Sequence, residues 1–316
     1  MESDNRRNQY YQKLCVDARR ATEELKNALG RRGASPLKSR MKSCGTSTEW
    51  KNVVRCGAVA CATCRSIYAS RQVGAIQEAF AGASNDSLAF VTIVMGLTSW
   101  TGDIREIFDT GRRKLRNMVD RNRRADARWS DLQIVGWLEV DAFDPHRFAD
   151  LPANKRVQLE AIGLPYIGAG PTWVVTLHAL VSLAGVDRYR LTEELQRSWA
   201  APTQVHVCEF HGDKSPDQNI NSLVRYCLKH QTDTATTVCH AEPWDISWKT
   251  EYYEYLYRWS KGFQSLRVWV KPRAAEPARS QDARTGRHSA IESAGAAYSN
   301  DVESDDSEEG YMPFTF

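Results

Sequence analysis

The sequence lacks any long hydrophobic segment, and no secretory signal is expected from its first residues. Its longest apolar runs, residues 88–97 and 173–184, are much shorter than the roughly 20 residues that cross a bilayer. The N-terminus is charged from Glu2 onward and has no apolar core of the kind found in secretory signals. A membrane protein and a secreted protein are therefore not expected, and we predict a cytoplasmic location.

Cysteine is scarce, with 8 residues in 316, and half of it falls within one short segment. In a reducing compartment such a cluster favours metal binding over disulfides. The last pair is a CxxC motif, which places two thiolates on one turn within about 2.3 Å of a zinc ion. We predict a structural Zn²⁺ site, with free or redox-active thiols as the alternative. The four candidate ligands are Cys44, Cys56, Cys61 and Cys64.

The net charge is only +3, but it is unevenly distributed along the chain. Residues 273–316 hold 4 Lys/Arg and 9 Asp/Glu, and a composition of this kind predicts a disordered acidic tail. The remainder is basic, which suggests a polyanionic partner. The sequence has no internal repeat. We divide it into a basic N-terminal arm (1–42), the cysteine segment with a helix (43–82), a main domain (83–272) and the tail.

Residues 173–181 are rich in β-branched and aromatic side chains and follow glycines and a proline, which predicts a buried central strand. Side chains alternate between the faces of a strand, so Trp173 and Leu177 belong to an apolar face and Thr176 and His178 to the other. A single strand histidine is either a hydrogen-bonded core residue or a ligand. On a second predicted strand, Glu139 stands among apolar residues, where a carboxylate is costly unless it is paired or binds a metal.

A predicted helix over residues 103–124 combines an apolar stripe with several basic residues on its other faces. These basic residues either form a solvated face or contact DNA phosphates, in which case binding would be sensitive to salt. The candidates for DNA contact are Arg112, Arg113, Lys114 and Arg116.

Another helix is predicted after Ser215, because Ser215, Pro216 and Gln218 form a capping box with proline in the first helical position. Its apolar stripe excludes Tyr226 and Lys229, which lie within about 60° of each other around the helix axis. A phenol and an ammonium are therefore presented together. Stacking of the tyrosine on a base or a neighbour is the alternative role.

Taken together, these segments resemble the rolling-circle replication initiators of plasmids, which belong to the HUH endonuclease superfamily. The resemblance extends from about residue 44 to residue 270. It depends on five motifs in the same order, namely residues 56–65, 90–93, 136–140, 173–178 and 226–229.

The resemblance implies an α+β fold in which a central antiparallel sheet carries helices on its outer face, with the four-cysteine segment preceding it. Residues 83–272 would form a HUH-like nuclease domain. Tyr226, assisted by Lys229, would nick a single-stranded or hairpin DNA origin and leave a 5′-phosphotyrosine and a free 3′-hydroxyl primer. Host replication proteins such as a helicase are further implied partners. The implied ligands of a catalytic Mg²⁺ or Mn²⁺ are His178, Glu139 and Thr176.

The chain departs from the family pattern at one position. The HUH motif has histidine at both ends, whereas this chain has Thr176-Leu177-His178. A hydroxyl is a weaker ligand than an imidazole, so either water or another residue completes the site, with His206 and His211 the nearest candidates, or the metal binds weakly. The alternatives are a DNA-binding protein with weakened catalysis on the same scaffold, and a related transposase or relaxase.

Overall fold

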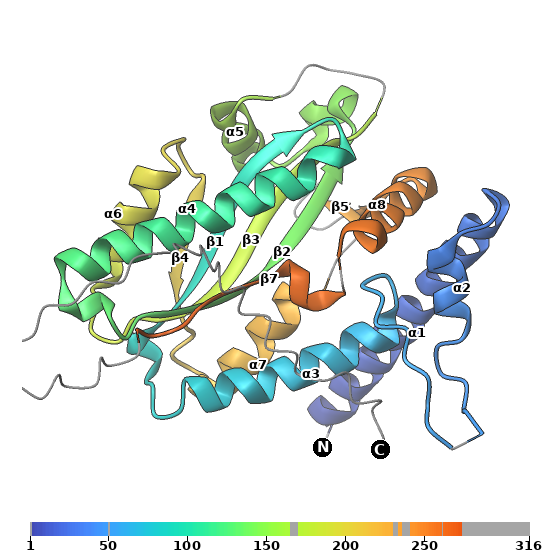
Figure 1. Ribbon diagram of the computed structural model, residues 1–316, viewed down its shortest axis with the longest axis horizontal. Coiled ribbons are helices and arrows are strands. Elements are labelled where there is room, and N and C mark those ends of the chain that lie inside the picture. The colour runs from blue at the N-terminus through green and yellow to red at the C-terminus, as the bar shows by residue number, and fades with distance from the viewer. Residues whose placement is uncertain are drawn as a thin grey trace, which may run out of the picture.

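The computed structural model describes residues 2–49, 51–164, 170–229, 233–235, 241–260 and 262–273, and it shows an α+β fold built on one large sheet (Figure 1). The strand order is β4-β1-β3-β2-β7, and all neighbouring strands are antiparallel. The predicted α+β class with a central antiparallel sheet is confirmed. The predicted acidic tail lies outside the described residues, except for Arg273.

The strand bounds are β1 (Leu88–Thr98), β2 (Gln133–Phe143), β3 (Thr172–Ser182), β4 (Val205–Glu209) and β7 (Arg267–Val270). The short strands β5 (Asp233–Ala235) and β6 (Ala241–Pro243) form a separate pair. β3 is the central strand, as predicted, and every residue in it except Ser182 is buried. Its side chains are therefore shielded from solvent on both faces by helices or by neighbouring side chains, which fits its nearly continuous apolar sequence.

Helices pack on both faces of the sheet rather than on one. On the first face lie α4 (Ile104–Ala125), α6 (Arg188–Ser198) and α8 (Ile246–Trp259), whose apolar side chains share a core with Val175 and Leu177. On the second face lie α3 (Ala62–Ala79) and α7 (Pro216–Cys227), which pack against Trp137 and Leu180. Figure 1 shows α4 crossing in front of the sheet, whereas α3 and α7 lie below the sheet in this view.

A further helix, α5 (Ala153–Ile162), covers the opposite end of the second face, where Leu159 packs on Val94 and Val174. The sequence predicts a loop in this region. Because α5 and α7 lie at opposite ends of the same face, the middle of that face is not covered by a helix.

The N-terminal segment forms α1 (Glu2–Arg31) and α2 (Pro36–Lys42). Leu25 and Leu29 of α1, with Leu37 and Met41 of α2, are buried in the same core as the cysteine segment. The region predicted as a basic arm therefore packs on the fold through its apolar side chains. Among the described residues, no helix has both the length and the apolar character needed to span a membrane.

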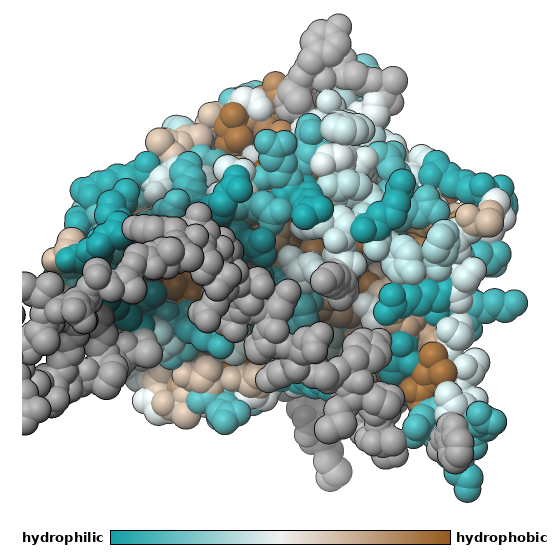
Figure 2. All heavy atoms as spheres, in the orientation of Figure 1, coloured by the Kyte–Doolittle hydropathy of each residue, from teal (hydrophilic) through white to brown (hydrophobic). Residues whose placement is uncertain are grey.

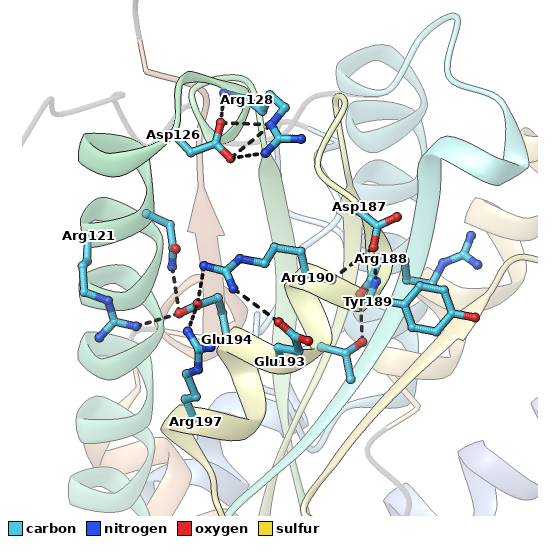
Figure 3. Close-up of polar contacts among 12 residues, drawn as sticks. Arg121, Asp126, Arg128, Asp187, Arg188, Tyr189, Arg190, Glu193, Glu194 and Arg197 are labelled. Carbon is cyan, nitrogen blue, oxygen red and sulfur yellow. Dashed lines mark hydrogen bonds and ion pairs between the residues drawn. The ribbon is translucent and has the colours of Figure 1, made fainter.

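One buried carboxylate ties α6 to α4 (Figure 3). Glu194 of α6 is 2% exposed and accepts from the Arg121 guanidinium at 2.9 Å and from the Asn122 amide at 3.3 Å. Arg190 and Arg197 of α6 also contact it, at 3.0 and 2.5 Å. Burial by itself raises the pKa of the Glu194 carboxyl, but these donors outweigh burial and lower it below its ordinary value.

We expect Glu194→Gln to lower the free energy of unfolding at pH 7 by about 1–3 kcal/mol, because the hydrogen bonds to the arginines lose their charge. The pKa of this carboxyl is lower in the folded than in the unfolded state. Its stabilisation is therefore present above the unfolded value, near 4.5, and is lost as the pH falls through the lower folded value. Chemical denaturation at pH 7 and pH 3 would show the difference between variant and wild type shrinking in acid. Glu193→Gln is the matched control, because Glu193 is 58% exposed and its surface ion pair contributes at most about 1 kcal/mol.

Candidate functional site

The four cysteines converge from successive pieces of local structure. α2 ends just before Cys44. The chain then reverses direction through an isolated antiparallel β-bridge between Ser47 and Val53, and Cys56 follows this bridge. Cys61 is the N-cap residue of α3 and Cys64 lies in its first turn. Cys56, Cys61 and Cys64 are buried, whereas Cys44 is partly exposed.

The sulfur atoms are arranged as a metal site requires. The Sγ atoms of Cys44 and Cys61 are 3.7 Å apart, those of Cys44 and Cys64 are 3.6 Å apart, and those of Cys56 and Cys64 are 3.5 Å apart. Tetrahedral zinc with bonds of about 2.3 Å separates its sulfur ligands by about 3.8 Å. The cluster can therefore hold a metal ion such as zinc. Elsewhere in the described part of the chain, no three His, Cys, Asp or Glu side chains lie this close together.

The thiols of the cluster differ in how readily they ionise. Hydrogen bonds from Cys56 and Cys64 lower the pKa of the Cys61 thiol below its ordinary value, so this thiol is the first to ionise. The backbone N–H of Gly57 donates to Cys64 Sγ at 3.3 Å. Hydrogen bonding to Cys61 and burial raise the pKa values of Cys56 and Cys64, and since zinc binds the thiolate and not the thiol, a bound ion would displace protons from these two residues.

The second candidate site lies in the middle of the second face of the sheet, between the ends that α5 and α7 cover. In the β2–β3 register Glu139 pairs with Thr176, and in the β1–β3 register Thr92 pairs with His178. The four side chains therefore share one face at the middle of the three central strands. This agrees with the two-face alternation predicted for β3.

A chain of polar contacts connects these residues. His178 Nε2 is 2.5 Å from Glu139 Oε2, and Lys229 Nζ is 3.4 Å from Glu139 Oε1. On the other side of the imidazole, Nδ1 is 3.0 Å from Thr92 Oγ1. His178 is only 7% exposed, so its ring is held between two polar partners inside the protein. The carboxylate on β2 is thus paired, as its apolar neighbours in the sequence require.

Tyr226 lies in the last turn of α7, and both halves of the predicted capping box at Ser215 are present at the start of this helix. The Tyr226 ring is nearly perpendicular to the His178 ring, with centroids 5.2 Å apart, and 42% of the residue is exposed. Lys229 follows the helix end, and its Nζ is 4.1 Å from the centroid of the Tyr226 ring. The structure therefore brings Tyr226, Lys229, His178 and Glu139 together.

The environment leaves the phenol protonated and the ammonium charged at neutral pH. Burial raises the pKa of Tyr226, and Glu139 adds to this, while Lys229 lowers it in part. Burial lowers the pKa of Lys229, but Glu139 and Tyr226 outweigh burial, so the pKa is raised. Lys229 opposes the raised pKa of the tyrosine without reversing it.

These residues lie at one end of a cleft of about 1040 Å³ that extends along the sheet toward α5. Asp141 of β2 and Lys155 of α5 form an ion pair in its other half. His206 of β4 lies directly opposite Thr92 and lines the cleft, whereas His211 is not part of its lining. Of the two histidines proposed to complete a metal site, only His206 faces the same space as His178.

Glu139 and His178 are the two strong candidate donors for a hard divalent cation on this face, and among the described residues no third His, Cys, Asp or Glu side chain gathers with them as the cysteines do. Two ligands at about 2.1 Å on adjacent octahedral positions lie about 3.0 Å apart, whereas Glu139 Oε2 and His178 Nε2 are only 2.5 Å apart and pair directly with each other. Thr176 lies opposite Glu139 and lines the same cleft.

The predicted DNA-contacting residues lie elsewhere. α4 packs on the opposite face of the sheet, and none of its basic residues lines the cleft. Arg112 pairs with Asp109 at 2.8 Å, and Lys114 Nζ is 5.0 Å from the centroid of the Trp199 ring. Arg113, Lys114 and Arg116 are exposed, and Figure 2 shows hydrophilic side chains along the α4 side of the molecule.

Three cleft residues were not identified from the sequence. Thr92 belongs to a predicted strand, but its contact with His178 requires the β1–β3 pairing. Asp141 and Lys155 meet only because α5 folds back over the sheet. The sequence feature that could have indicated a role for Thr92 is its polar side chain within an apolar stretch of β1.

Comparison of the chain with protein-family models, with curated proteins and with solved structures finds no match. The resemblance to the HUH endonucleases therefore has no support beyond the residues that suggested it. What the protein does must be inferred from the geometry of the two sites.

Proposed function

We propose that this protein is a DNA endonuclease and strand transferase that nicks a single-stranded or hairpin origin to begin rolling-circle replication. The proposal depends on one observation above all. A partly exposed phenol, Tyr226, lies beside the His178–Glu139 pair and an ammonium in a single open cleft.

In the proposed reaction, the Tyr226 oxygen attacks the phosphorus of a DNA phosphodiester as the bond from phosphorus to the 3′ oxygen breaks. The products are a 5′-phosphotyrosine and a strand with a free 3′-hydroxyl. The phenol loses its proton to water, and the leaving 3′ oxygen takes a proton from water. The adduct retains the phosphoester bond, so a later 3′-hydroxyl can displace the tyrosine and rejoin the strand.

Lys229 has a defined task in this scheme. Its raised pKa keeps it positively charged, and its position beside the Tyr226 ring allows it to stabilise the negative charge of the bound phosphate. Its ion pair with Glu139 orients the ammonium and holds the carboxylate toward His178.

Glu139, His178 and Thr176 would hold the Mg²⁺ or Mn²⁺. When bound, such an ion supplies Lewis-acid stabilisation of charge on the scissile phosphate. In the same proposal the four cysteines bind structural Zn²⁺, which would stabilise the segment between α2 and α3.

The exposed basic residues of α4 would hold DNA outside the cleft. We expect the double variant Arg113→Ala/Arg116→Ala to weaken binding to all DNA sequences and to reduce the slope of log affinity against log salt by about 0.9 for each phosphate that is no longer neutralised. Fluorescence anisotropy at several salt concentrations measures both quantities. Arg20→Ala, on α1 and 70% exposed, is the matched control, and an equal effect there would indicate only a general influence of charge.

A second function is favoured by Thr176, which stands where the family has a histidine. In this alternative the protein has the same fold and binds DNA, but its catalysis of nicking is weak. Thr176→His separates the two: a large gain in nicking would mean that the present site is impaired, whereas an unchanged rate would mean that the other ligands suffice. The decisive assay for nicking itself is a denaturing gel that detects a metal-dependent covalent adduct with labelled single-stranded DNA.

A further inference from the structure

We infer that the acidic segment of residues 301–309 binds the exposed basic side of α4 and competes there with DNA. Among its nine residues the segment holds six acidic ones and no Lys or Arg. The inference rests on the proposed function only in so far as DNA binds α4, because contact between the segment and the helix can be measured without DNA.

The second half of α4 carries a dense positive charge. From residue 112 to residue 124 it has seven Lys/Arg and one acidic residue, Asp120. Three of its arginines form ion pairs with carboxylates of the fold at 2.8 to 3.6 Å. The other four basic side chains are exposed, and none of them forms an ion pair with a carboxylate in the described part of the chain. These four are Arg113, Lys114, Arg116 and Arg124.

The positive charges on this side of α4 are crowded. Partial burial lowers the pKa of the Arg116 guanidinium below its ordinary value, and the charge of Arg112 lowers it further, while Asp120 opposes both effects. An anion that contacts this surface relieves the repulsion between neighbouring cations. Both a DNA phosphate and a carboxylate meet that requirement.

The acidic tail leaves the fold at the C-terminal end of this same helix. Arg123, in the last turn of α4, donates from its guanidinium to the backbone carbonyl of Lys271, just after β7. Two residues later, the backbone N–H of Arg273 donates to the carbonyl oxygen of Ser130 at 2.8 Å, in the connection between α4 and β2. The first residue of the tail is therefore fixed beside the basic half of α4.

The chain between this point and the acidic segment is long enough to return along the helix. It consists of the 27 residues 274–300, which can span at most about 95 Å, whereas the 22 residues of α4 extend over about 33 Å. Individual exposed ion pairs are weak, but a flexible link of the kind that the tail composition predicts gives an effective concentration on the order of millimolar. A weak contact between the segment and α4 is then sufficient to oppose DNA.

The first test uses a peptide and no DNA. A fluorescent peptide of residues 301–309 is titrated at low salt with the full chain, in which the six acidic residues of that segment are replaced by Asn or Gln so that they do not compete. We expect saturable binding that Arg113→Ala/Arg116→Ala weakens by about 5-fold or more, because half of the unpaired cations are removed. Arg19→Ala/Arg20→Ala removes the same charge from exposed positions of α1 and should leave peptide binding unchanged.

The second test measures DNA binding by the full chain with fluorescence anisotropy. At low salt the variant with the six amide replacements should bind single-stranded DNA about 10-fold more tightly than the wild type, and the gain should fade as salt screens the exposed charges. The gain should be lost in the Arg113→Ala/Arg116→Ala background and kept in the Arg19→Ala/Arg20→Ala background.

Absence of peptide binding, an unchanged DNA affinity of the amide variant, or an equal gain in both backgrounds would overturn the inference and leave the proposed function untouched. Peptide binding at α4 by a protein that does not bind DNA would overturn the proposed function and leave the contact between the segment and the helix in place.

Discussion

Replacing Tyr226 with phenylalanine should abolish the covalent protein–DNA adduct and the nick while preserving DNA binding. The substitution removes the attacking oxygen and keeps the ring that packs against His178 and Phe90. Loss of an essential nucleophile lowers the rate by a factor on the order of 10⁴ or more. The measurement is a denaturing gel with labelled single-stranded origin DNA and Mn²⁺ or Mg²⁺, together with an anisotropy titration that reports binding.

Two features of the structure sharpen this test. Tyr189 of α6 is 83% exposed and does not line the cleft, so Tyr189→Phe is the matched control and should retain the full adduct. Tyr252 and Tyr253 of α8 are not accessible as replacement nucleophiles, because they are buried in the core at 2% and 6% exposure. An adduct that persists in Tyr226→Phe would remove Tyr226 from the proposed role.

Loss of one cysteine ligand should have the largest effect on folding. We expect Cys61→Ser to reduce bound zinc from one ion per chain to none after dialysis against a chelator, because the apparent binding free energy of such sites is about 10–16 kcal/mol and depends on all four thiolates. The segment between α2 and α3 should then exchange its amide hydrogens much faster. Elemental analysis gives the zinc content, and hydrogen exchange read by mass spectrometry locates the loosened segment.

The control is Cys208→Ser, because Cys208 lies on β4 and takes no part in the cluster. That variant should bind zinc and exchange hydrogen as the wild type does. Zinc retained in Cys61→Ser, or a wild-type protein purified from zinc-containing medium without any zinc, would contradict the assignment of the cluster.

The central strand and the site helix could be read from local sequence, because the pattern that specifies each is local. Residues 173–181 predict a strand, and β3 spans residues 172–182 with the predicted division of its faces. The capping box at Ser215 fixes the start of α7. Tyr226 and Lys229 point to the same side of the helix axis, as predicted, and this side faces Glu139. This holds although α7 ends at Cys227, because the chain continues in a turn.

The remaining features depend on contacts between distant segments. α5 was predicted as a loop because only Leu159 of this helix is fully buried, so its sequence carries little periodic signal. The sequence identifies the basic residues of α4, but it does not tell which face of the sheet the helix covers. The contact of Thr92 with His178 likewise requires the order of strands in the sheet, which no local pattern contains.

The placement of α4 and the cleft on opposite faces of one sheet has a consequence for the path of DNA. A DNA molecule that touches Arg113 and Tyr226 at once must turn around an edge of the sheet, at β4 or β7. Duplex DNA has a persistence length of about 50 nm and resists so tight a turn, whereas an unpaired strand bends with little cost. The protein would then be suited to a junction, with paired DNA along α4 and the unpaired strand entering the cleft.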